Sequence, residues 1–176
     1  KHVQQLYREL LKDVKGIEVH KQPETGEYDS NFWLCCITLD KDLQIRGQEL
    51  AYREVIKTAV GGAAGVIQAV ESARTDCQPN DNVEALRIFL QEKKIEARPV
   101  WKPMHCQPVY RQGVVKIENI RTKDEDIVCQ TSDSSVAYIN GISEDIFKIG
   151  MCLPAGPYVS DDDVRYIVEK IREAID

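Results

Sequence analysis

The sequence predicts an α+β fold, a two-layer sandwich in which a small antiparallel or mixed sheet of three to four strands carries helices packed on it. Three observations support this prediction. Helical segments with one apolar stripe occur at both ends of the 176-residue chain and in its middle. Short apolar strands separate these segments, and strand and helix alternate irregularly. With 43% hydrophobic and 30% charged residues, the chain has the composition of an ordinary globular protein with one core.

The first predicted elements are a helix and two strands. Apolar residues recur at helical spacing from the start of the chain, and Gly16 then supplies a left-handed stop. Residues 17–20 form a short predicted strand. Residues 31–39 (NFWLCCITL) form the most continuous apolar strand, so we expect it at the centre of the sheet, with Phe32 and Trp33 in the core. Because the chain begins directly with a helix and without methionine, we expect a piece of a longer protein.

The middle of the chain contains two further helical patterns. Residues 50–70 keep helical spacing on both sides of the glycine-rich run 61–65, which indicates a helical hairpin or a long interrupted helix. The run lacks the lysine-containing ending of a phosphate-binding loop, so close packing or a turn is the favoured interpretation. Asp81 and Glu84 have the spacing of a capping box and predict the start of the next helix.

Two strand-like stretches follow this helix. Residues 95–101 are predicted as a strand, and Pro99 restricts that strand to the edge of the sheet or to its end. The polar stretch 112–138 contains two pieces with alternating apolar residues. We expect these pieces to form a hairpin around residues 122–126.

The end of the chain has clear helix signals. A short helix is predicted from Ser143, with Gly150 as its cap, and residues 151–153 form a short strand. Ser160 then provides an N-cap, followed by three aspartates in the first turn of a final amphipathic helix.

Charge and hydropathy exclude several classes of partner. The formal net charge is −6 and no basic face is evident, so we expect no nucleic-acid partner. No apolar run is long enough to span a bilayer and no signal-peptide pattern is present, so we expect no membrane partner and a cytoplasmic location.

The six cysteines do not have the spacing of a zinc site. Cys35 and Cys36 are adjacent in a predicted strand, which sends their side chains to opposite faces of the sheet. The other four stand alone, so we expect free thiols and no bound metal.

The segment 96–110 (EARPVWKPMHCQPVY) is the strongest candidate for a functional site. Its three prolines stiffen the backbone and exclude regular structure beyond its first residues. Trp101, Lys102 and His105 are the residue types that stack on rings, pair with phosphate and exchange protons. A packing anchor, a plain surface charge and a turn cap are the respective structural alternatives. Cys106 follows His105, but neighbours in an extended chain point apart, so a nucleophile–base pair is disfavoured.

Several separated blocks resemble the C-terminal small domain of the DegT/DnrJ/EryC1/StrS sugar aminotransferases, and within that family the perosamine synthases. The blocks are 30–34 (SNFWL), 82–86 (NVEAL), 95–110 (IEARPVWKPMHCQPVY), 141–156 (GISEDIFKIGMCLPAG) and the helix opened by Ser160. The resemblance covers one domain, residues 1–176. Residues of about 45–73 and 114–137 look longer than the family pattern and are interpreted as insertions.

This resemblance implies a fold-type I aminotransferase that uses pyridoxal 5'-phosphate to move an amino group from an amino acid, commonly glutamate, to a 4-keto nucleotide-linked deoxysugar. It implies that the Schiff-base lysine lies on a preceding large domain, so this chain has no catalytic residue, should be inactive alone and is expected to bind no cofactor by itself. By resemblance, Trp101, Lys102 and His105 contact the sugar nucleotide, with Asn31 as a further candidate. The implied partners are the large domain, the substrate and a second subunit of a homodimer.

A non-catalytic binding or interaction module that kept the small-domain fold is the alternative. The coding sequence upstream of Lys1 distinguishes the two hypotheses. A preceding large domain with a lysine in a serine- and glycine-flanked loop would support the enzyme, and a nearby start codon would support the module.

Overall fold

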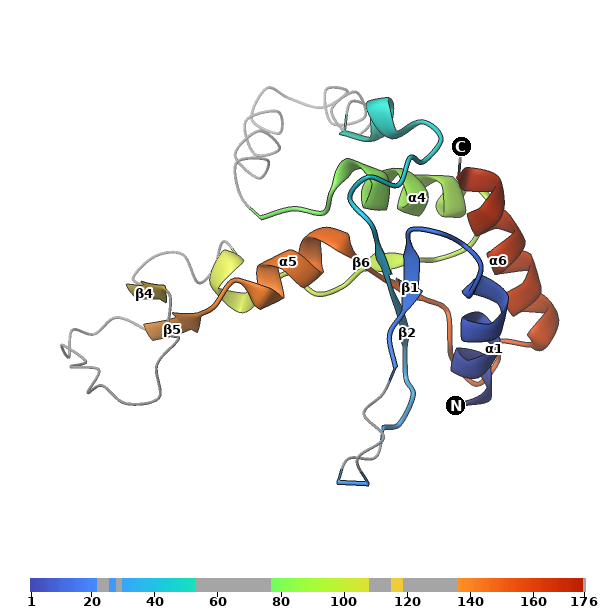
Figure 1. Ribbon diagram of the computed structural model, residues 1–176, viewed down its shortest axis with the longest axis horizontal. Helices are drawn as coiled ribbons and strands as arrows, with labels where there is room; N and C mark the ends of the chain where they lie inside the picture. The colour runs from blue at the N-terminus through green and yellow to red at the C-terminus, as the bar shows by residue number, and fades with distance from the viewer. Residues whose placement is uncertain (22–25, 28–29, 53–76, 108–114, 119–135, 176) are drawn as a thin grey trace.

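The computed structural model describes residues 1–21, 26–27, 30–52, 77–107, 115–118 and 136–175, with side chains left aside for 115–118 and 136–138. Figure 1 shows a small sheet with helices α1, α4 and α6 gathered on one side and helix α5 on the other. The two ends of the chain lie at the ends of helices in the same layer.

The central sheet has four strands, β1 (Ile17–Val19), β2 (Cys35–Leu39), β6 (Gly150–Leu153) and β3 (Arg98–Pro99), in the order β1-β2-β6-β3. Every neighbouring pair is antiparallel. This architecture confirms the predicted α+β fold and the internal position of β2. Pro99 lies on an edge strand, where its missing N–H leaves no gap in the ladder.

Three helices form the second layer and enclose the core. Helices α1 (His2–Leu11) and α4 (Asp81–Glu92) both pack against α6 (Asp161–Ala174) and against the strands. Apolar residues from all three helices and from β2 and β6 are fully buried between the layers (Tyr7, Leu11, Ile37, Leu39, Val83, Leu86, Leu90, Met151, Leu153, Val164 and Ile171). The predicted amphipathic stripes therefore face one common core.

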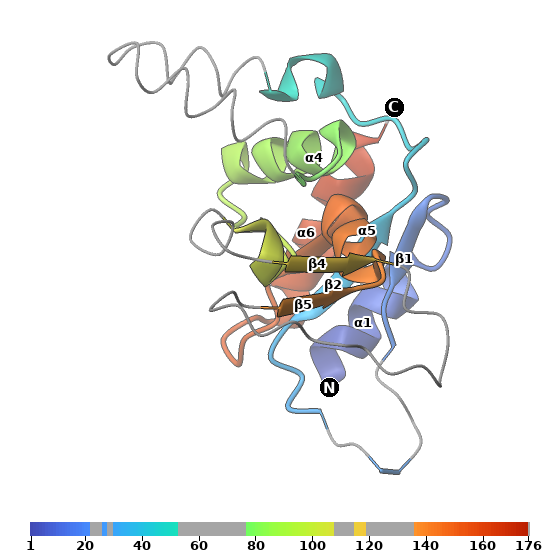
Figure 2. The ribbon, with the colours of Figure 1, turned by 90° about the vertical axis from the view of Figure 1, so that its left-hand side faces the viewer.

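The opposite face of the sheet is covered in part. Helix α5 (Ile142–Ile149) lies against β2 and β6. Figure 2 shows α5 in front of the sheet, together with β4 (Val115–Glu118) and β5 (Val136–Ile139). Strands β4 and β5 pair in parallel. The second piece of the predicted hairpin (126–131) lies outside the described residues, so the hairpin stays a prediction. The turn of that hairpin (122–126) and most of the helical segment 50–70, with its glycine run, lie outside the described residues.

The predicted strand 31–39 begins only at Cys35, and the residues before it form a turn. The Ser30 hydroxyl accepts a hydrogen bond from the Phe32 amide (3.1 Å), and the Asn31 side chain accepts one from the Trp33 amide (3.1 Å). Phe32 itself has a left-handed φ of 51°. Ser and Asn compete with the strand ladder in this way because their side chains satisfy the backbone locally. Trp33 is therefore 66% exposed, and the prediction that it lies in the core is wrong.

The helix ends follow the sequence signals in part. At α6, Ser160 and Asp163 form the reciprocal bonds of a capping box, which confirms the N-cap predicted there. At α4 the N-cap is Asn80 without a side-chain bond, and Glu84 pairs instead with Arg87 (2.6 Å), so the capping box predicted for Asp81 and Glu84 is wrong.

Gly150 ends α5 in an extended conformation, with φ −95° and ψ 141°, and begins β6 directly. It is a C-cap residue as predicted, but not a left-handed one. A Cβ atom at this position would lie 2.6 Å from the Ile146 carbonyl oxygen. The glycine is therefore explained by the close approach of helix and strand.

Candidate functional site

The proline-rich segment leaves the edge strand β3 and crosses to the α5 side of the sheet. The Val100 amide still donates to the Gly150 carbonyl (3.1 Å), which fixes where the segment begins. Pro103 is buried and extended, and Met104–Cys106 then form one turn of 3-10 helix, closed by a bond from the Cys106 amide to the Pro103 carbonyl (2.9 Å). The prediction that the segment has no regular structure beyond its start is wrong for this turn.

Two tryptophans from separate segments pack against each other beside this turn. The ring centroids of Trp33 and Trp101 are 5.8 Å apart and the planes are inclined by 42°. Trp101 remains 65% exposed and Trp33 a similar fraction. A tilted aromatic pair of this kind is held in place by its own contact while it keeps ring surface available to a ligand.

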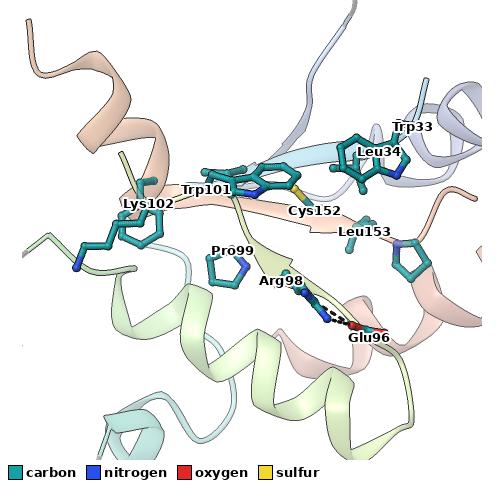
Figure 3. Close-up of a pocket in the computed structure, with 12 residues that line it drawn as sticks. Trp33, Leu34, Glu96, Arg98, Pro99, Trp101, Lys102, Cys152 and Leu153 are labelled. Atoms are coloured by element: carbon teal, nitrogen blue, oxygen red, sulfur yellow. Dashed lines mark hydrogen bonds and ion pairs between the residues drawn. The ribbon is translucent and has the colours of Figure 1, made fainter. Parts of the chain in front are cut away.

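The tryptophan pair borders a pocket of about 570 Å³, shown in Figure 3. The remaining wall is mostly apolar and comes from the residue before β2, from β3 with its flanking residues, from α5 and from the end of β6 with the residue that follows it. It includes Leu34, Pro99, Phe147 and Cys152. Lys102 and one ion pair supply the charge, and in that pair the Arg98 Nε donates to the Glu96 carboxylate over 2.9 Å. Both of these side chains are about three-quarters exposed, so their ion pair is open to competition from a ligand.

The four predicted site residues occupy different positions. Trp101 and Lys102 line the pocket. In Figure 3 the Lys102 side chain extends away from Trp33 and Leu34, beyond Trp101. Asn31 positions the turn that presents Trp33. His105 bonds to Glu144 outside the residues that line the pocket.

Sequence reasoning missed two residues of the pocket. Trp33 was assigned to the core because it stands in an apolar run, although the preceding Ser30 and Asn31 were a turn signal. Arg98 stands in the predicted strand 95–101, and the structure places its ion pair with Glu96 in the pocket wall. No spacing in the sequence indicates that these two residues share one pocket.

A pair of thiols lies at the pocket, because Cys152 lines it and bonds to Cys36. Cys36 and Cys152 are opposite one another on β2 and β6, with 3.7 Å between the two Sγ atoms. The hydrogen bond from Cys152 lowers the pKa of Cys36 to about 7, although burial acts in the other direction. The same bond, with burial, raises the pKa of Cys152 far above its ordinary value. Cys35 points to the core, and burial raises its pKa to about 12.

A second polar cluster joins the 3-10 turn to the start of α5. The His105 Nε2 lies 2.7 Å from the Glu144 Oε1, and the Cys106 thiol donates to the same oxygen over 3.5 Å. The two neighbours converge because the turn is helical, so the prediction that they point apart is wrong. Cys77 is close by, with its thiol 3.9 Å from the Glu144 carbonyl oxygen. Burial raises the pKa of the Cys77 thiol. The positive charges of Lys148 and Lys102 and a hydrogen bond with Cys106 act to lower that pKa.

Comparison with curated proteins finds similarity to part of two enzymes that are named as an aminotransferase and a perosamine synthase. It is 26% identical over 163 residues to EpsN of Bacillus subtilis, named as a pyridoxal phosphate-dependent aminotransferase, and the match covers 93% of this chain and 27% of EpsN. It is 32% identical over 90 residues to the GDP-perosamine synthase of Escherichia coli O157:H7, covering 51% of this chain and 18% of that enzyme. No family model matches the chain. The chain thus spans about a quarter or less of these relatives' length.

Solved structures give the same result for the fold. The aminotransferase TlmJ of Streptoalloteichus hindustanus superposes with a TM-score of 0.55 at 13% identity, over 98% of this chain and 30% of TlmJ. A DegT DnrJ EryC1 StrS aminotransferase of Brucella abortus superposes with a TM-score of 0.53 at 19% identity, over 98% of this chain and 29% of that protein. The chain is thus similar in sequence to named aminotransferases, and it shares its fold with part of a solved DegT DnrJ EryC1 StrS aminotransferase. Its fold corresponds to one segment of these larger enzymes.

Among the residues of the chain that the structure describes, no helix is both long enough and apolar enough to cross a membrane.

Proposed function

We propose that this chain is the C-terminal small domain of an aminotransferase that uses pyridoxal 5'-phosphate and aminates a 4-keto nucleotide-linked deoxysugar, with glutamate as amino donor. The relatives support the reaction class, since one is named as a pyridoxal phosphate-dependent aminotransferase and another as a GDP-perosamine synthase. The short coverage of those relatives supports a separate large domain, and the family resemblance implies a homodimer. None of the five described cysteines forms a disulfide, as is usual in the cytoplasm, the compartment that we propose.

The tryptophan-bordered pocket is the observation that carries the proposal. Trp33 and Trp101 expose ring faces beside an apolar wall, and Arg98 lies in the same wall. A nucleotide sugar offers an aromatic base and a sugar ring for the tryptophans and a diphosphate for a guanidinium. We therefore assign the pocket to the nucleotide part of the substrate.

The four candidate residues divide into two roles in this proposal. Trp101 is a contact residue, and Lys102 becomes one when its flexible side chain rotates toward the phosphates. Asn31 is a positioning residue, because its side chain holds the amide of Trp33. His105 positions the proline-rich segment through Glu144.

The pocket does not by itself fit pyridoxal phosphate. The cofactor needs a lysine for its covalent attachment and a cup of donors for its phosphate. The one lysine among the lining residues, Lys102, extends away from the tryptophan pair in Figure 3. The proposal therefore leaves cofactor attachment and proton transfer to the large domain, and gives this chain the recognition of substrate.

Two measurements on the full-length protein test the proposal. We expect the purified protein to show the absorbance of bound pyridoxal phosphate and to convert 4-keto nucleotide sugars to amino sugars with glutamate, detected by mass spectrometry. The 176-residue chain alone should do neither. A full-length protein that binds no pyridoxal phosphate would refute the enzyme and favour the non-catalytic module.

A further inference from the structure

Three metal-ligating side chains converge beside the pocket, from two segments that are distant in sequence. His105 and Cys106 come from the 3-10 turn, and Glu144 comes from the first turn of α5. Their donor atoms, one nitrogen, one sulfur and one oxygen, all lie within 4.8 Å of one another. The prediction that no metal binds used only the spacing of cysteines, which does not reveal a set assembled across the fold.

One of the three separations already matches those that a zinc ion requires, and a second is shorter. Zinc bonds of about 2.0–2.3 Å in a tetrahedron put neighbouring ligand atoms roughly 3.3–3.8 Å apart. The Cys106 Sγ and Glu144 Oε1 are already 3.5 Å apart, and the His105 Nε2 and Glu144 Oε1 are 2.7 Å apart. An ion would therefore replace the histidine–carboxylate contact after the two groups separate by roughly 0.6 Å, the difference between 2.7 Å and the lower limit of about 3.3 Å.

The chemistry and surroundings of the cluster also favour zinc. A thiolate and an imidazole select a borderline metal ion over magnesium or calcium, which prefer oxygen ligands. One thiolate and one carboxylate balance the two positive charges of zinc, so the loaded site is neutral. Cys106 is 7% exposed, and the His105 and Glu144 side chains are 13% and 23% exposed. The site is thus sheltered but accessible, because two of its three ligands reach solvent.

We propose that His105, Cys106 and Glu144 bind one zinc ion with an open fourth position. The ion would tie the proline-rich segment to the start of α5. Because Trp101 and Phe147 flank the ligands along these two segments and both line the pocket, the metal would stabilise the pocket wall. This inference does not depend on the aminotransferase reaction.

Zinc affinity of the full-length protein tests the proposal, measured by competition with a chromogenic chelator in the presence of a phosphine reductant. We expect one zinc ion per chain, and a zinc affinity lower by more than about 100-fold in Cys106→Ser. Even the loss of a residue that only hydrogen-bonds to a ligand lowers metal affinity roughly 10- to 100-fold. Glu144→Gln and His105→Asn should each weaken binding as well. Cys36→Ser and His2→Ala are matched controls outside the cluster. The first removes a half-buried thiol, and the second removes an exposed histidine that pairs with Asp161. Circular dichroism establishes that each variant is folded.

A second readout separates a bound ion from a change in folding. Zinc should protect Cys106 from alkylation, as measured by peptide mass spectrometry, while Cys36 keeps its reactivity. The proposal is overturned if no stoichiometric zinc binds at micromolar concentration. It is equally overturned if Cys36→Ser removes the binding and Cys106→Ser does not.

Discussion

Trp33 and Trp101 build one wall from two segments, the turn before β2 and the residues after β3, with 5.8 Å between their ring centroids. Neither segment could present its indole in this position alone. Asn31 holds the first through the Trp33 amide, and Val100 anchors the second to Gly150 on β6. The sheet therefore brings together two aromatic rings that the sequence places far apart.

Removal of one ring should weaken substrate binding more than catalysis. In the full-length enzyme we expect Trp101→Ala to raise the KM for the nucleotide sugar roughly 5- to 100-fold, because base–aromatic stacking contributes about 1–3 kcal/mol. The kcat should change much less, since the ring is placed at the substrate and not at the reacting carbon. Trp101→Phe should recover part of the loss. Tyr158→Ala, which removes a 96% exposed aromatic outside the pocket, is the control, and an equal effect there would contradict the assignment.

The two cations of the pocket should contribute unequally. Arg98 lies in the pocket wall beside Glu96, whereas Lys102 has to rotate toward a ligand. We expect Arg98→Ala to raise the KM for the nucleotide sugar about tenfold, and Lys102→Ala to raise it less, since charge-assisted hydrogen bonds contribute roughly 1.5–3 kcal/mol. Steady-state kinetics at two salt concentrations should show a weaker salt dependence in both variants. An unchanged KM in Lys102→Ala, as in the exposed control Lys12→Ala, would remove Lys102 from the site.

The Cys36–Cys152 pair should give the protein one reactive thiol near neutral pH. The pKa of Cys36 is lowered to about 7 by the Cys152 hydrogen bond, so the thiolate fraction rises as pH increases through that value. Alkylation of Cys36, followed by peptide mass spectrometry, should therefore increase between pH 6 and 8, roughly one pH unit on either side of the pKa. Cys35, whose pKa is raised to about 12, should stay unreactive over this range.

Cys152→Ala provides the control for this titration. Loss of the donor should return the Cys36 pKa toward its ordinary range, which shifts the alkylation profile to higher pH. With oxidised glutathione, the unchanged protein should form a Cys36–Cys152 disulfide by thiol–disulfide exchange, since the residues face each other across antiparallel strands. A profile that is the same with and without Cys152 would show that the hydrogen bond does not control the thiol.

Local sequence signals predicted most of the fold because they depend on neighbouring residues. The apolar stripes of α1, α4 and α6, the cap at Ser160 and the edge position of Pro99 all follow from spacing within one element. The errors occur where a side chain competes with the expected structure. At Ser30 and Asn31, two short polar side chains accept hydrogen bonds from the backbone, so the strand that the apolar run predicts starts later, at Cys35.

The candidate site could be predicted only in part, because it is assembled from four segments. The proline-rich segment identified Trp101 and Lys102, but Trp33 reaches Trp101 only through strand order. Glu144 likewise reaches His105 because α5 folds back over the sheet. Contacts of this kind depend on the register of β2, β3 and β6, which no local pattern contains.

Gly150 should be the least replaceable of the described glycines, because it joins α5 to β6 without a loop. In Gly150→Ala, the new methyl group would lie 2.6 Å from the Ile146 carbonyl oxygen and 2.9 Å from the nearest Val100 methyl carbon. One of these neighbours is backbone, so the helix and the strand have to move apart. We expect the free energy of unfolding, measured with urea, to fall by about 1–3 kcal/mol, the range for overpacked sites. Gly156→Ala is the matched control, since its Cβ would meet no atom within 4 Å. Because the same movement would displace Val100 and the adjacent Trp101, a stable Gly150→Ala protein with an unaltered pocket would contradict this account of the helix–strand junction.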